Sequence, residues 1–357
     1  MKIIHTSDVH IDSPLTSRLS PDKVKERRAE LRSAWRRLID EAERASADAV
    51  IIAGDLFDEG RISPRTAKYA LDAISAARGI TFFYLEGNHE GSALRDTGLD
   101  IPENLCFFGD EWTYYRLGDV TVAGRGGVSE GIFDTLELPD DRKHIVVLHG
   151  ELRDSRCAED IIGLRDTLGK GIDYLALGHY HSFYETALPD GGVAVYCGTP
   201  EGRGFDEVGE CGYVLIDTEG GEIGYRFIPF AKRRLHECEV DITGAESARA
   251  IEERAEAALL GIPAADLVRI CLVGGYRPEL IKDTEGLIRR FSGRFYYLDV
   301  KDCSRPIIDP EDYKYDKTLK GEFIRAVMAD TELSDDMKAR IISCGINALL
   351  GEELFGE

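Results

Sequence analysis

Seven side chains that can bind a metal ion follow five short apolar runs of the chain. The runs cover residues 3–4, 49–53, 81–85, 145–148 and 174–177, and the side chains that follow them are Asp8, His10, Asp55, Asn88, His149, His179 and His181. Short apolar runs bounded by glycine and polar residues are typical of buried β-strands. Because open α/β sheets carry their sites at the carboxyl ends of strands, we expect the seven side chains to gather in one place.

The types of these side chains restrict the metal. Carboxylate, amide and imidazole groups suit manganese, iron, zinc or nickel rather than calcium. Two ions about 3.5–4 Å apart need a bridging carboxylate, and seven ligands form two four-ligand sites only if one ligand is shared. Asp55, on a tight turn after Gly54, is the expected bridge. Gly54, Gly87 and Gly178 each precede a ligand, where a backbone without Cβ can bend away from the strand end.

The same residues stand in five ordered motifs: Asp-x-His at 8–10, Gly-Asp-x-x-Asp at 54–58, Gly-Asn-His-Glu at 87–90, His-Gly at 149–150 and Gly-His-x-His at 178–181. This set resembles the calcineurin-like metallophosphoesterase family. The strings at 5–12, 54–58, 177–181 and 196–205 resemble, more narrowly, the SbcD/YhaO-type nuclease subunit of a DNA repair complex. The resemblance implies an α/β fold, a four-layer α/β/β/α sandwich with two mixed sheets, followed by a small α/β cap domain and a C-terminal helical tail.

The resemblance also implies a role for each ligand. One divalent ion, expected to be Mn²⁺, would bind Asp8, His10, Asp55 and His181, and a second would bind Asp55, Asn88, His149 and His179. Water held between the two ions becomes hydroxide near neutral pH and attacks phosphorus in line. His89 would assist the leaving oxygen rather than bind metal, and Asp58 would orient a ligand imidazole.

The pattern of the whole chain predicts three parts. They are a metallophosphoesterase (nuclease) domain at 1–232, a small α/β capping domain at 233–304, and a linker with C-terminal helices at 305–357. In the first part, Ser20-Pro21 and Ser63-Pro64 mark helix starts, and Gly79 is expected to end the second helix. Strands are predicted between 112 and 128 and, as antiparallel strands, at 193–196, 212–216 and 222–229. The cap alternates strands and helices at 235–242, 245–260, 267–273, 278–291 and 294–300.

The helices outside the predicted sheets allow two interpretations each. By resemblance, the C-terminal helices dock on the coiled coil of an SMC/ABC-type ATPase subunit (SbcC-like), but they could equally close on the protein's own cap. The helix that begins at Pro64 either contributes to a homodimer or buries its apolar face, with Leu71 and Ile74, on the sheet. Both partner interpretations require apolar side chains that stay exposed.

Composition narrows the class of protein. A length of 357 residues indicates more than one module, and a hydrophobic fraction of 43% supports a globular interior. The N-terminus lacks a signal pattern and no apolar run is long enough to span a bilayer, so a cytoplasmic protein without membrane contact is predicted. The 8 cysteines form no Cys-x-x-Cys pair and are expected to be reduced thiols.

A formal net charge of −22 is unusual for a protein that binds DNA, because phosphate backbones attract Lys and Arg. Either local basic groups and bound metal supply positive charge, or the substrate is small and no DNA binds. The helix from Pro21 carries a basic face, including Arg27 and Arg37, which either faces DNA or is solvated beside acidic neighbours such as Glu30. Further candidate DNA contacts are Arg203, Arg289, Arg290 and Arg294.

Three functions follow from these observations. The leading hypothesis is a Mn-dependent phosphodiesterase that acts on DNA as an exonuclease or endonuclease subunit in DNA repair. The alternative is a stand-alone small-molecule nucleotide phosphodiesterase or phosphatase, and the third is a non-enzymatic scaffold. The complete ligand set disfavours the scaffold. The cap and the C-terminal helices favour the first hypothesis over the second, because a minimal small-molecule enzyme needs neither.

Overall fold

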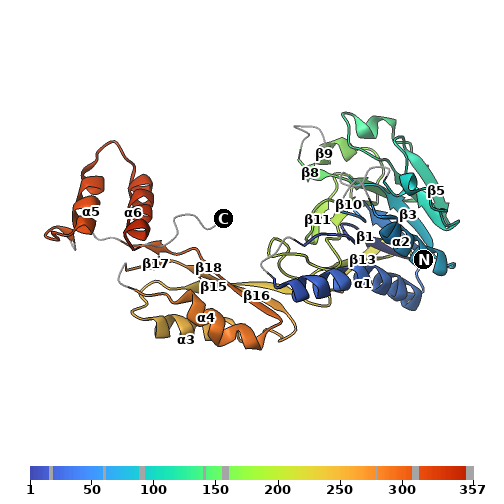
Figure 1. Cartoon of the computed structure of the whole chain (residues 1–357). Helices are drawn as coiled ribbons and strands as arrows, with labels where there is room; N and C mark the ends of the chain where they lie inside the picture. The colour runs from blue at the N-terminus through green and yellow to red at the C-terminus, as the bar shows by residue number, and fades with distance from the viewer. Residues whose placement is uncertain are drawn as a thin grey trace. The chain divides into compact units, whose positions relative to one another are not determined.

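A computed structural model describes residues 1–15, 19–58, 62–87, 93–139, 142–154, 161–277, 280–307 and 313–350. The chain divides into two compact units, Met1–Leu235 and His236–Glu357 (Figure 1). The first unit holds all of the predicted metal ligands. The finer division into a cap at 233–304 and a C-terminal segment at 305–357 stays a prediction.

One mixed six-stranded sheet, sheet A, carries the first three predicted strands. Its strand order is β14-β13-β1-β2-β3-β4. Strands β1 to β4 are parallel to one another, and β13 and β14 are antiparallel additions at one edge. The strands are β1 (Lys2–Thr6), β2 (Ala49–Ala53), β3 (Thr81–Leu85), β4 (Leu105–Phe107), β13 (Gly212–Asp217) and β14 (Gly224–Pro229).

A second mixed six-stranded sheet, sheet B, has the order β11-β12-β10-β7-β6-β5. Its members are β5 (Thr113–Leu117), β6 (Val120–Gly124), β7 (Lys143–His149), β10 (Tyr174–Gly178), β11 (Tyr184–Ala187) and β12 (Val193–Tyr196). The prediction of β12 as antiparallel was only partly right. It pairs antiparallel with β11 but parallel with β10, because β11, which the sequence did not reveal, reverses the chain between them.

The two sheets pack face to face, and alternate residues of each strand point to different cores. In β2, Ile51 packs into the core between the sheets, which also holds Phe83 and Ile145. Its neighbours Val50 and Ile52 point to the opposite face of sheet A, where the helices lie. Burial on both faces explains why these strands are continuous apolar runs. The predicted α/β sandwich with two stacked mixed sheets is confirmed.

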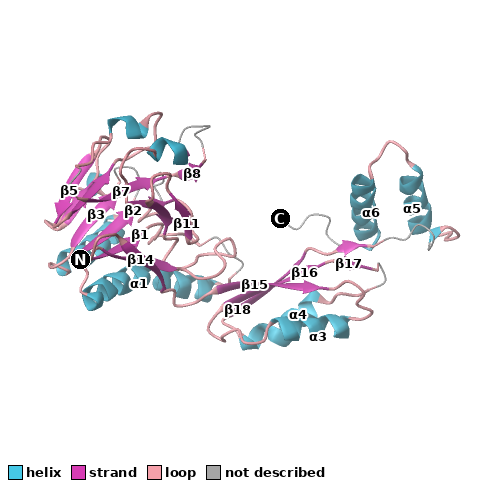
Figure 2. Ribbon diagram, turned by 180° about the vertical axis from the view of Figure 1, so that it is seen from behind, coloured by secondary structure: helices cyan, strands magenta, loops and turns pink. Residues whose placement is uncertain are grey.

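The outer layers differ in kind. Helices α1 (Pro21–Ala45) and α2 (Pro64–Ala76) cover sheet A and contribute Trp35, Leu71 and Ile74 to its core. Figure 2 shows α1 running along this face of the sheet. In the described part of the chain, the outer face of sheet B is covered by the 3₁₀ helices η2 (Ile132–Thr135) and η3 (Leu164–Thr167) and by loops. The short elements η1 (Arg95–Thr97), β8 (Glu151–Arg153) and β9 (Ile161–Gly163) complete the first unit.

Helix α2 is shorter than predicted at its C-terminus. Ser63 caps its start by accepting a hydrogen bond from the Thr66 amide at 3.1 Å. The helix ends at Ala76 rather than at Gly79, because the Asn104 side-chain amide lies against the last turn and donates to the carbonyls of Ile74, Ala77 and Ile80. Since Leu71 and Ile74 are buried in this unit's own core, a homodimer through α2 stays a prediction.

A set of charged side chains built around the buried Arg27, Glu30 and Glu201 connects α1 to the end of the first unit. This α1 ion cluster contains Arg27, Glu30, Arg37, Glu201, Lys232 and Arg233. Arg27 is 1% exposed and lies 3.1 Å from Glu201, and its guanidinium also donates to the Gly202 carbonyl at 2.7 Å. The assignment of Arg27 to a solvated or DNA-facing surface was therefore wrong, because its side chain is buried between the nearby Glu30 and the distant Glu201.

The second unit alternates strands and helices as predicted. Strands β15, β16 and β18 form one sheet in that order, and Ile251, Leu287 and Phe291 pack in its core. The second helix begins at Thr284 because the Asp283 side chain caps it, and residues 278–279 of the predicted helix lie outside the described residues. The elements are β15 (Leu235–Asp241), α3 (Ala248–Ala258), β16 (Leu267–Val273), β17 (Gly275–Tyr276), α4 (Thr284–Phe291), η4 (Ser292–Arg294), β18 (Tyr297–Asp302), β19 (Arg305–Pro306), α5 (Leu319–Ala329) and α6 (Asp335–Leu350).

Helices α5 and α6 pack against each other. Ile324 of α5 and Ile342 of α6 are buried together with Tyr313. Other apolar side chains nearby are exposed, among them Tyr315, Leu319 and Met337. None of the described helices is both long and apolar enough to cross a membrane.

Candidate metal centre

The carboxyl ends of four parallel strands bring six of the seven predicted ligands to one place in the first unit. Asp8 and His10 follow β1, and Asp55 follows β2, in sheet A. His149 ends β7 beside Gly178 of β10, in sheet B, and His179 and His181 follow in the next loop. Asn88 and His89 lie outside the described residues. The sequence-based expectation of a shared site at the strand ends thus matches the placement of the six described ligands.

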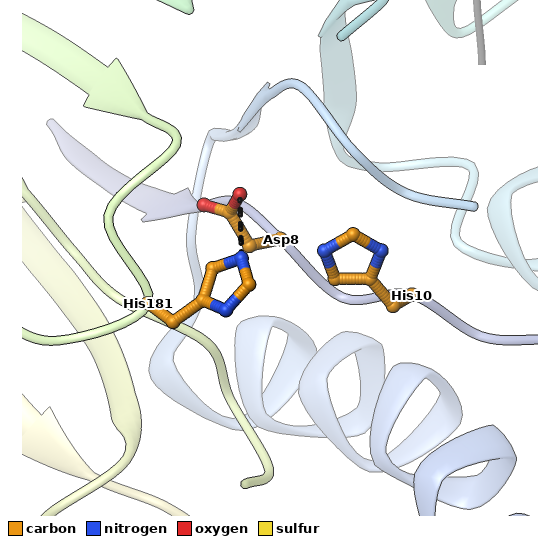
Figure 3. A group of neighbouring side chains, drawn as sticks. All are labelled: Asp8, His10 and His181. Atoms are coloured by element: carbon orange, nitrogen blue, oxygen red, sulfur yellow. Dashed lines mark ion pairs between the residues drawn. The ribbon is translucent and has the colours of Figure 1, made fainter. Parts of the chain in front are cut away.

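Five of the six described candidates form two overlapping groups that share Asp8, whereas His179 is in neither group and its ring centroid lies 5.7 Å from that of His149. In each of the sets Asp8, His10, His181 and Asp8, Asp55, His149, one ligand atom per residue lies within 4.8 Å of the others. Figure 3 shows the first set, with His181 Nε2 3.6 Å from Asp8 Oδ1. Asp55 Oδ2 lies 3.4 Å from His149 Nε2 and 4.0 Å from His10 Nε2. Asp55 Oδ2 therefore lies near one imidazole of each predicted metal position, and the bridging role of Asp55 stays a prediction.

Three imidazoles share one orientation. Their Nδ1 atoms face acceptors away from the centre: Asp58 Oδ1 at 2.9 Å for His10, the Ala53 carbonyl at 2.9 Å for His149, and Glu207 Oε1 at 2.7 Å for His181. Their Nε2 atoms face the carboxylates of Asp8 and Asp55. A metal-binding histidine shows this arrangement, because the acceptor holds the proton on one nitrogen and leaves the other lone pair for the ion.

Burial supports the same conclusion. Asp8 is 0% exposed and Asp55 is 2% exposed. Buried carboxylates are stable only when paired with positive charge or bound to a metal. Among the described residues, Nε2 of His149 is buried and has no hydrogen-bond partner, although it lies 3.4 Å from Asp55. The donor set and this buried nitrogen fit a divalent metal ion.

The local charges shift the pKa values of the histidines. Burial opposes protonation of His149, but the carboxylates of Asp55 and Asp8 outweigh it and raise its pKa to about 9. Burial likewise opposes protonation of His181, and Glu207 and Asp8 raise its pKa nonetheless. Burial and the neighbouring His149 lower the pKa of His179. The field at the centre therefore favours a positive charge between the rings.

The backbone at the ligands is strained and cross-linked. Asp8, His10, Asp55 and His179 have positive φ values of 49°, 45°, 51° and 113°. For residues other than glycine, such conformations cost roughly 1–3 kcal/mol each and persist only where surrounding contacts hold them. The amides of Asp8 and His10 donate to the carbonyls of Gly54 and Asp55 at 3.0 and 3.1 Å. The ligand loops after β1 and β2 are thus joined before any metal binds.

The three glycines before the ligands are needed for space. A Cβ on Gly54 would lie 2.1 Å from His149 Nδ1, and one on Gly87 would lie 2.1 Å from Asp55 Oδ1. A Cβ on Gly178 would lie 1.9 Å from the Ala53 carbonyl. Of these three, Gly54 also has a positive φ, 92°. The expected backbone bend explains Gly54, whereas close packing explains Gly87 and Gly178.

The residues that contact the ligand side chains include one that the sequence did not reveal. Glu207, 1% exposed, faces His181, and nothing in its local sequence distinguishes it from other acidic residues. Asp58 faces His10 as expected for an orienting residue. Arg203, predicted as a DNA contact, lies 2.9 Å from Asp58 and 2.7 Å from Glu207.

The other predicted DNA contacts lie in the second unit and also face carboxylates. Arg289 pairs with Asp283 and Glu285. Arg290 pairs with Glu252 and Glu256, and Arg294 with Glu256. These ion pairs reduce the positive charge that the three arginines offer to a phosphate backbone.

A family model for calcineurin-like phosphoesterases matches residues 1–183, about half of the chain. The chain belongs to the calcineurin-like phosphoesterase family. It is 28% identical over 274 residues to the uncharacterized metallophosphoesterase YhaO of Bacillus subtilis, which covers 72% of this chain and 67% of YhaO. It is 26% identical over 241 residues to the DNA double-strand break repair protein Mre11 of Sulfurisphaera tokodaii, covering 61% of this chain and 60% of that protein.

The match spans 60% of the length of the Mre11 relative, so the activity of the whole relative is not carried over with it. A solved dimetal phosphatase from Danio rerio is 12% identical with a TM-score of 0.44, over 63% of this chain and 95% of that one. A similarity this low carries no argument about function.

Proposed function

We propose that this chain is a manganese-dependent phosphodiesterase that cleaves DNA as the nuclease subunit of a DNA repair complex. The observation that carries the proposal is the set of three imidazoles whose Nε2 atoms face two buried aspartates while each Nδ1 faces an acceptor. Membership of the calcineurin-like family supports phosphoester hydrolysis. The relatives that are DNA double-strand break repair proteins support DNA as the substrate.

Each ligand has a task in this proposal. Bound divalent ions would supply a nucleophile at neutral pH and neutralise charge on the phosphoryl group. Asp55 would bridge the two positions, with Asp8, His10 and His181 on one side. His149 and His179 would complete the other side together with Asn88, and His89 would protonate the leaving oxygen. Asp58 would hold the His10 ring in place, since its carboxylate lies 2.9 Å from Nδ1.

An aromatic cavity beside the ligands supports a nucleotide-containing substrate. A cavity of about 470 Å³ is lined by His179, Tyr180, His181, Ser182, Phe183, Tyr184 and Asp206. Tyr184 is 51% exposed, on strand β11. Exposed aromatic rings stack on bases without strong sequence preference. A phosphodiester held by the ligands could therefore place a neighbouring base against the aromatic side chains that line this cavity.

A partner would help to hold DNA. The four predicted DNA contacts all pair with carboxylates, and the chain carries a net charge of −22. We infer an SMC/ABC-type ATPase partner, docked on the exposed apolar side chains at α5 and α6, such as Leu319 and Met337. Deleting the residues after Ser304 should then spare hydrolysis of a small diester and abolish association with the ATPase. Loss of the small-diester activity in this deletion would contradict a recruiting role.

The net charge favours a second candidate, a phosphodiesterase or phosphatase for small nucleotides. A strongly acidic surface repels a long phosphate backbone more than a single nucleotide. The aromatic cavity serves either substrate equally. The two candidates therefore differ in substrate length rather than in chemistry.

One comparison of substrates tests the proposal. Metal-depleted protein is supplied with Mn²⁺ at low salt and given duplex DNA, a dinucleotide, bis-p-nitrophenyl phosphate and p-nitrophenyl phosphate. We expect cleavage of DNA ends and of the bis-aryl diester, with little activity on the monoester. Robust turnover of the dinucleotide with no detectable DNA cleavage would reject the nuclease and favour the second candidate.

The role of His89 can be tested in the same assay. His89→Ala should retain metal and lose about 10²–10⁴-fold in turnover, the range expected for a general acid. Metal content measured after dialysis separates this role from that of a ligand. If His89→Ala releases metal, His89 is a ligand and the assigned role is wrong.

A further inference from the structure

Three charged side chains join two histidines of the centre. Asp58 Oδ1 lies 2.9 Å from His10 Nδ1, and Glu207 Oε1 lies 2.7 Å from His181 Nδ1. The guanidinium of Arg203 lies between the two carboxylates, 2.9 Å from Asp58 and 2.7 Å from Glu207, and its Nη2 also lies 3.1 Å from His181 Nδ1. We refer to Asp58, Arg203 and Glu207 as the carboxylate bridge. It connects the imidazoles that come from two different sheets.

The carboxylate bridge is fixed at several points. The Arg203 backbone amide donates to Glu207 Oε2 at 2.6 Å, and Nε of the same residue donates to Oε1 at 2.9 Å. The side chain of Glu207 is 1% exposed, that of Arg203 17% and that of Asp58 21%. An arginine in this geometry presents a planar fork to two carboxylates, which a flexible lysine cannot reproduce. The bridge therefore has one well-defined arrangement.

The other predicted metal position lacks an equivalent contact at His149. Its Nδ1 faces the neutral carbonyl of Ala53 at 2.9 Å. A carboxylate partner makes an imidazole a more basic ligand than a neutral carbonyl does. The position that His10 and His181 would form thus has two charged supports, whereas His149 has a neutral one.

We propose that Arg203 and Glu207 are positioning residues for the metal bound by His10 and His181, and that the carboxylate bridge makes this position the tighter of the two. The inference rests on the proposed two-metal function and deepens it. It gives Arg203 a task different from the DNA contact predicted from sequence. The guanidinium would orient two ligand rings through their carboxylates rather than bind a phosphate.

Calorimetric titration of the metal-depleted full chain with MnCl₂ tests the proposal without an activity assay. The unmodified chain should bind two ions with unequal affinity. Arg203→Ala and Glu207→Gln should each weaken the tighter ion by roughly 10–100-fold and leave the weaker one unchanged. Arg203→Lys, which keeps the charge but not the planar fork, should bind the tighter ion with an affinity between those of the unmodified chain and Arg203→Ala. Arg36→Ala removes an exposed ion pair with Asp40 on α1 and should change neither ion.

Three results would overturn the proposal. One is that both variants bind two ions like the unmodified chain while KM for DNA rises, which would make Arg203 a substrate contact. Another is that both ions weaken equally, because the bridge would then support the whole centre. The third is that the unmodified chain binds fewer than two ions. Thermal unfolding monitored by circular dichroism checks that the variants are folded, and Glu207→Gln preserves the shape of the side chain.

The result is independent of the proposed substrate. If the unmodified chain binds two ions and fails to cleave DNA, the nuclease proposal fails and the bridge proposal stands. If DNA is cleaved but Arg203→Ala binds both ions normally, the bridge proposal fails alone.

Discussion

Two groups of buried charges in the first unit contrast in how they are balanced. In the α1 ion cluster, four cationic side chains face Glu30 and Glu201. At the candidate metal centre, the described residues supply four carboxylates, Asp8, Asp55, Asp58 and Glu207, and the guanidinium of Arg203. In the first group each carboxylate is paired with more than one cationic side chain, whereas in the second the carboxylates outnumber the one guanidinium.

The difference indicates which group is structural and which is a binding site. Buried charge is expensive unless it is paired, so a folded chain compensates it wherever no ligand is expected. The α1 ion cluster follows this rule and ties residues 27–37 to residues 201–233. The centre departs from it, since its carboxylates face imidazoles, which balance them only when protonated, and the raised pKa values of His149 and His181 reflect this demand. A divalent ion would remove the imbalance.

The largest effect should come from Asp55, the carboxylate proposed to bind both metal ions. Asp55→Asn removes a charge from both predicted metal positions, so metal binding and phosphodiester hydrolysis should both fall by more than the roughly 10–100-fold expected for loss of a supporting residue. Metal content and turnover of bis-p-nitrophenyl phosphate measure the two losses. Asp40→Asn, in an exposed pair, is the matched control. An Asp55→Asn protein that holds two ions would refute the shared position.

The next largest effect is a loss of stability in the α1 ion cluster. Arg27→Met leaves Glu30 and Glu201 buried without one of their cations and should lower the free energy of unfolding by about 3–5 kcal/mol, toward the lower value because Lys232 and Arg233 stay. Urea unfolding of the first unit gives the change. Arg36→Ala should cost only about 0.3–0.5 kcal/mol, as an exposed helix pair does. Equal losses in the two variants would mean that burial of Arg27 adds nothing.

Metal should stabilise the first unit, and only through the centre. An ion that binds the folded chain at 100 times its Kd adds about 2.7 kcal/mol. Adding Mn²⁺ should therefore raise the midpoint of thermal unfolding for the unmodified chain and for Arg27→Met, but not for Asp55→Asn. A rise that persists in Asp55→Asn would place the stabilising ion elsewhere.

The smallest predicted effect is the response of the α1 ion cluster to acid. Burial would raise the pKa of Glu30, but hydrogen bonds from Arg233, Lys232 and Arg27 lower it from 4.5 to about 2. A lowered pKa stabilises the fold above pH 4.5, and this contribution, on the order of 2 kcal/mol, is lost as the pH falls from 4.5 toward 2. Urea midpoints at pH 7 and pH 3 measure the loss. Glu30→Gln should show a smaller difference, and an unchanged difference would contradict the assignment.

The sequence predicted the two sheets well because their strands follow local patterns, and the same patterns predicted where the six described ligand candidates lie. Strands buried on two faces, such as β2 and β7, are continuous apolar runs, and the ligands follow them directly. Strand β11 escaped prediction because Tyr184 and Glu185 are exposed and polar or aromatic rather than apolar.

Partners that depend on the folded chain could not be predicted. Glu207 reaches His181, and Arg27 reaches Glu201, only after distant segments have come together. Charge and position made Arg203 a candidate for DNA binding, and its contact with Asp58, 145 residues earlier in the chain, has no local signature. The same holds for Asn104, which ends helix α2 from a distance of 30 residues along the chain.

The glycine at position 178 sets the opening between the two halves of the sandwich. Its missing Cβ lets sheet B approach the Ala53 carbonyl of sheet A, where a methyl group would lie 1.9 Å from that oxygen. Stacked sheets usually lie about 10 Å apart. Backbone contact between Gly178 and Ala53 therefore brings the two sheets closer together at the carboxyl ends of β10 and β2 than elsewhere. Short aspartate and histidine side chains from the two sheets can then bind the same small ion. A single methyl group at position 178 would push the two sheets apart and increase the distance between their ligand side chains.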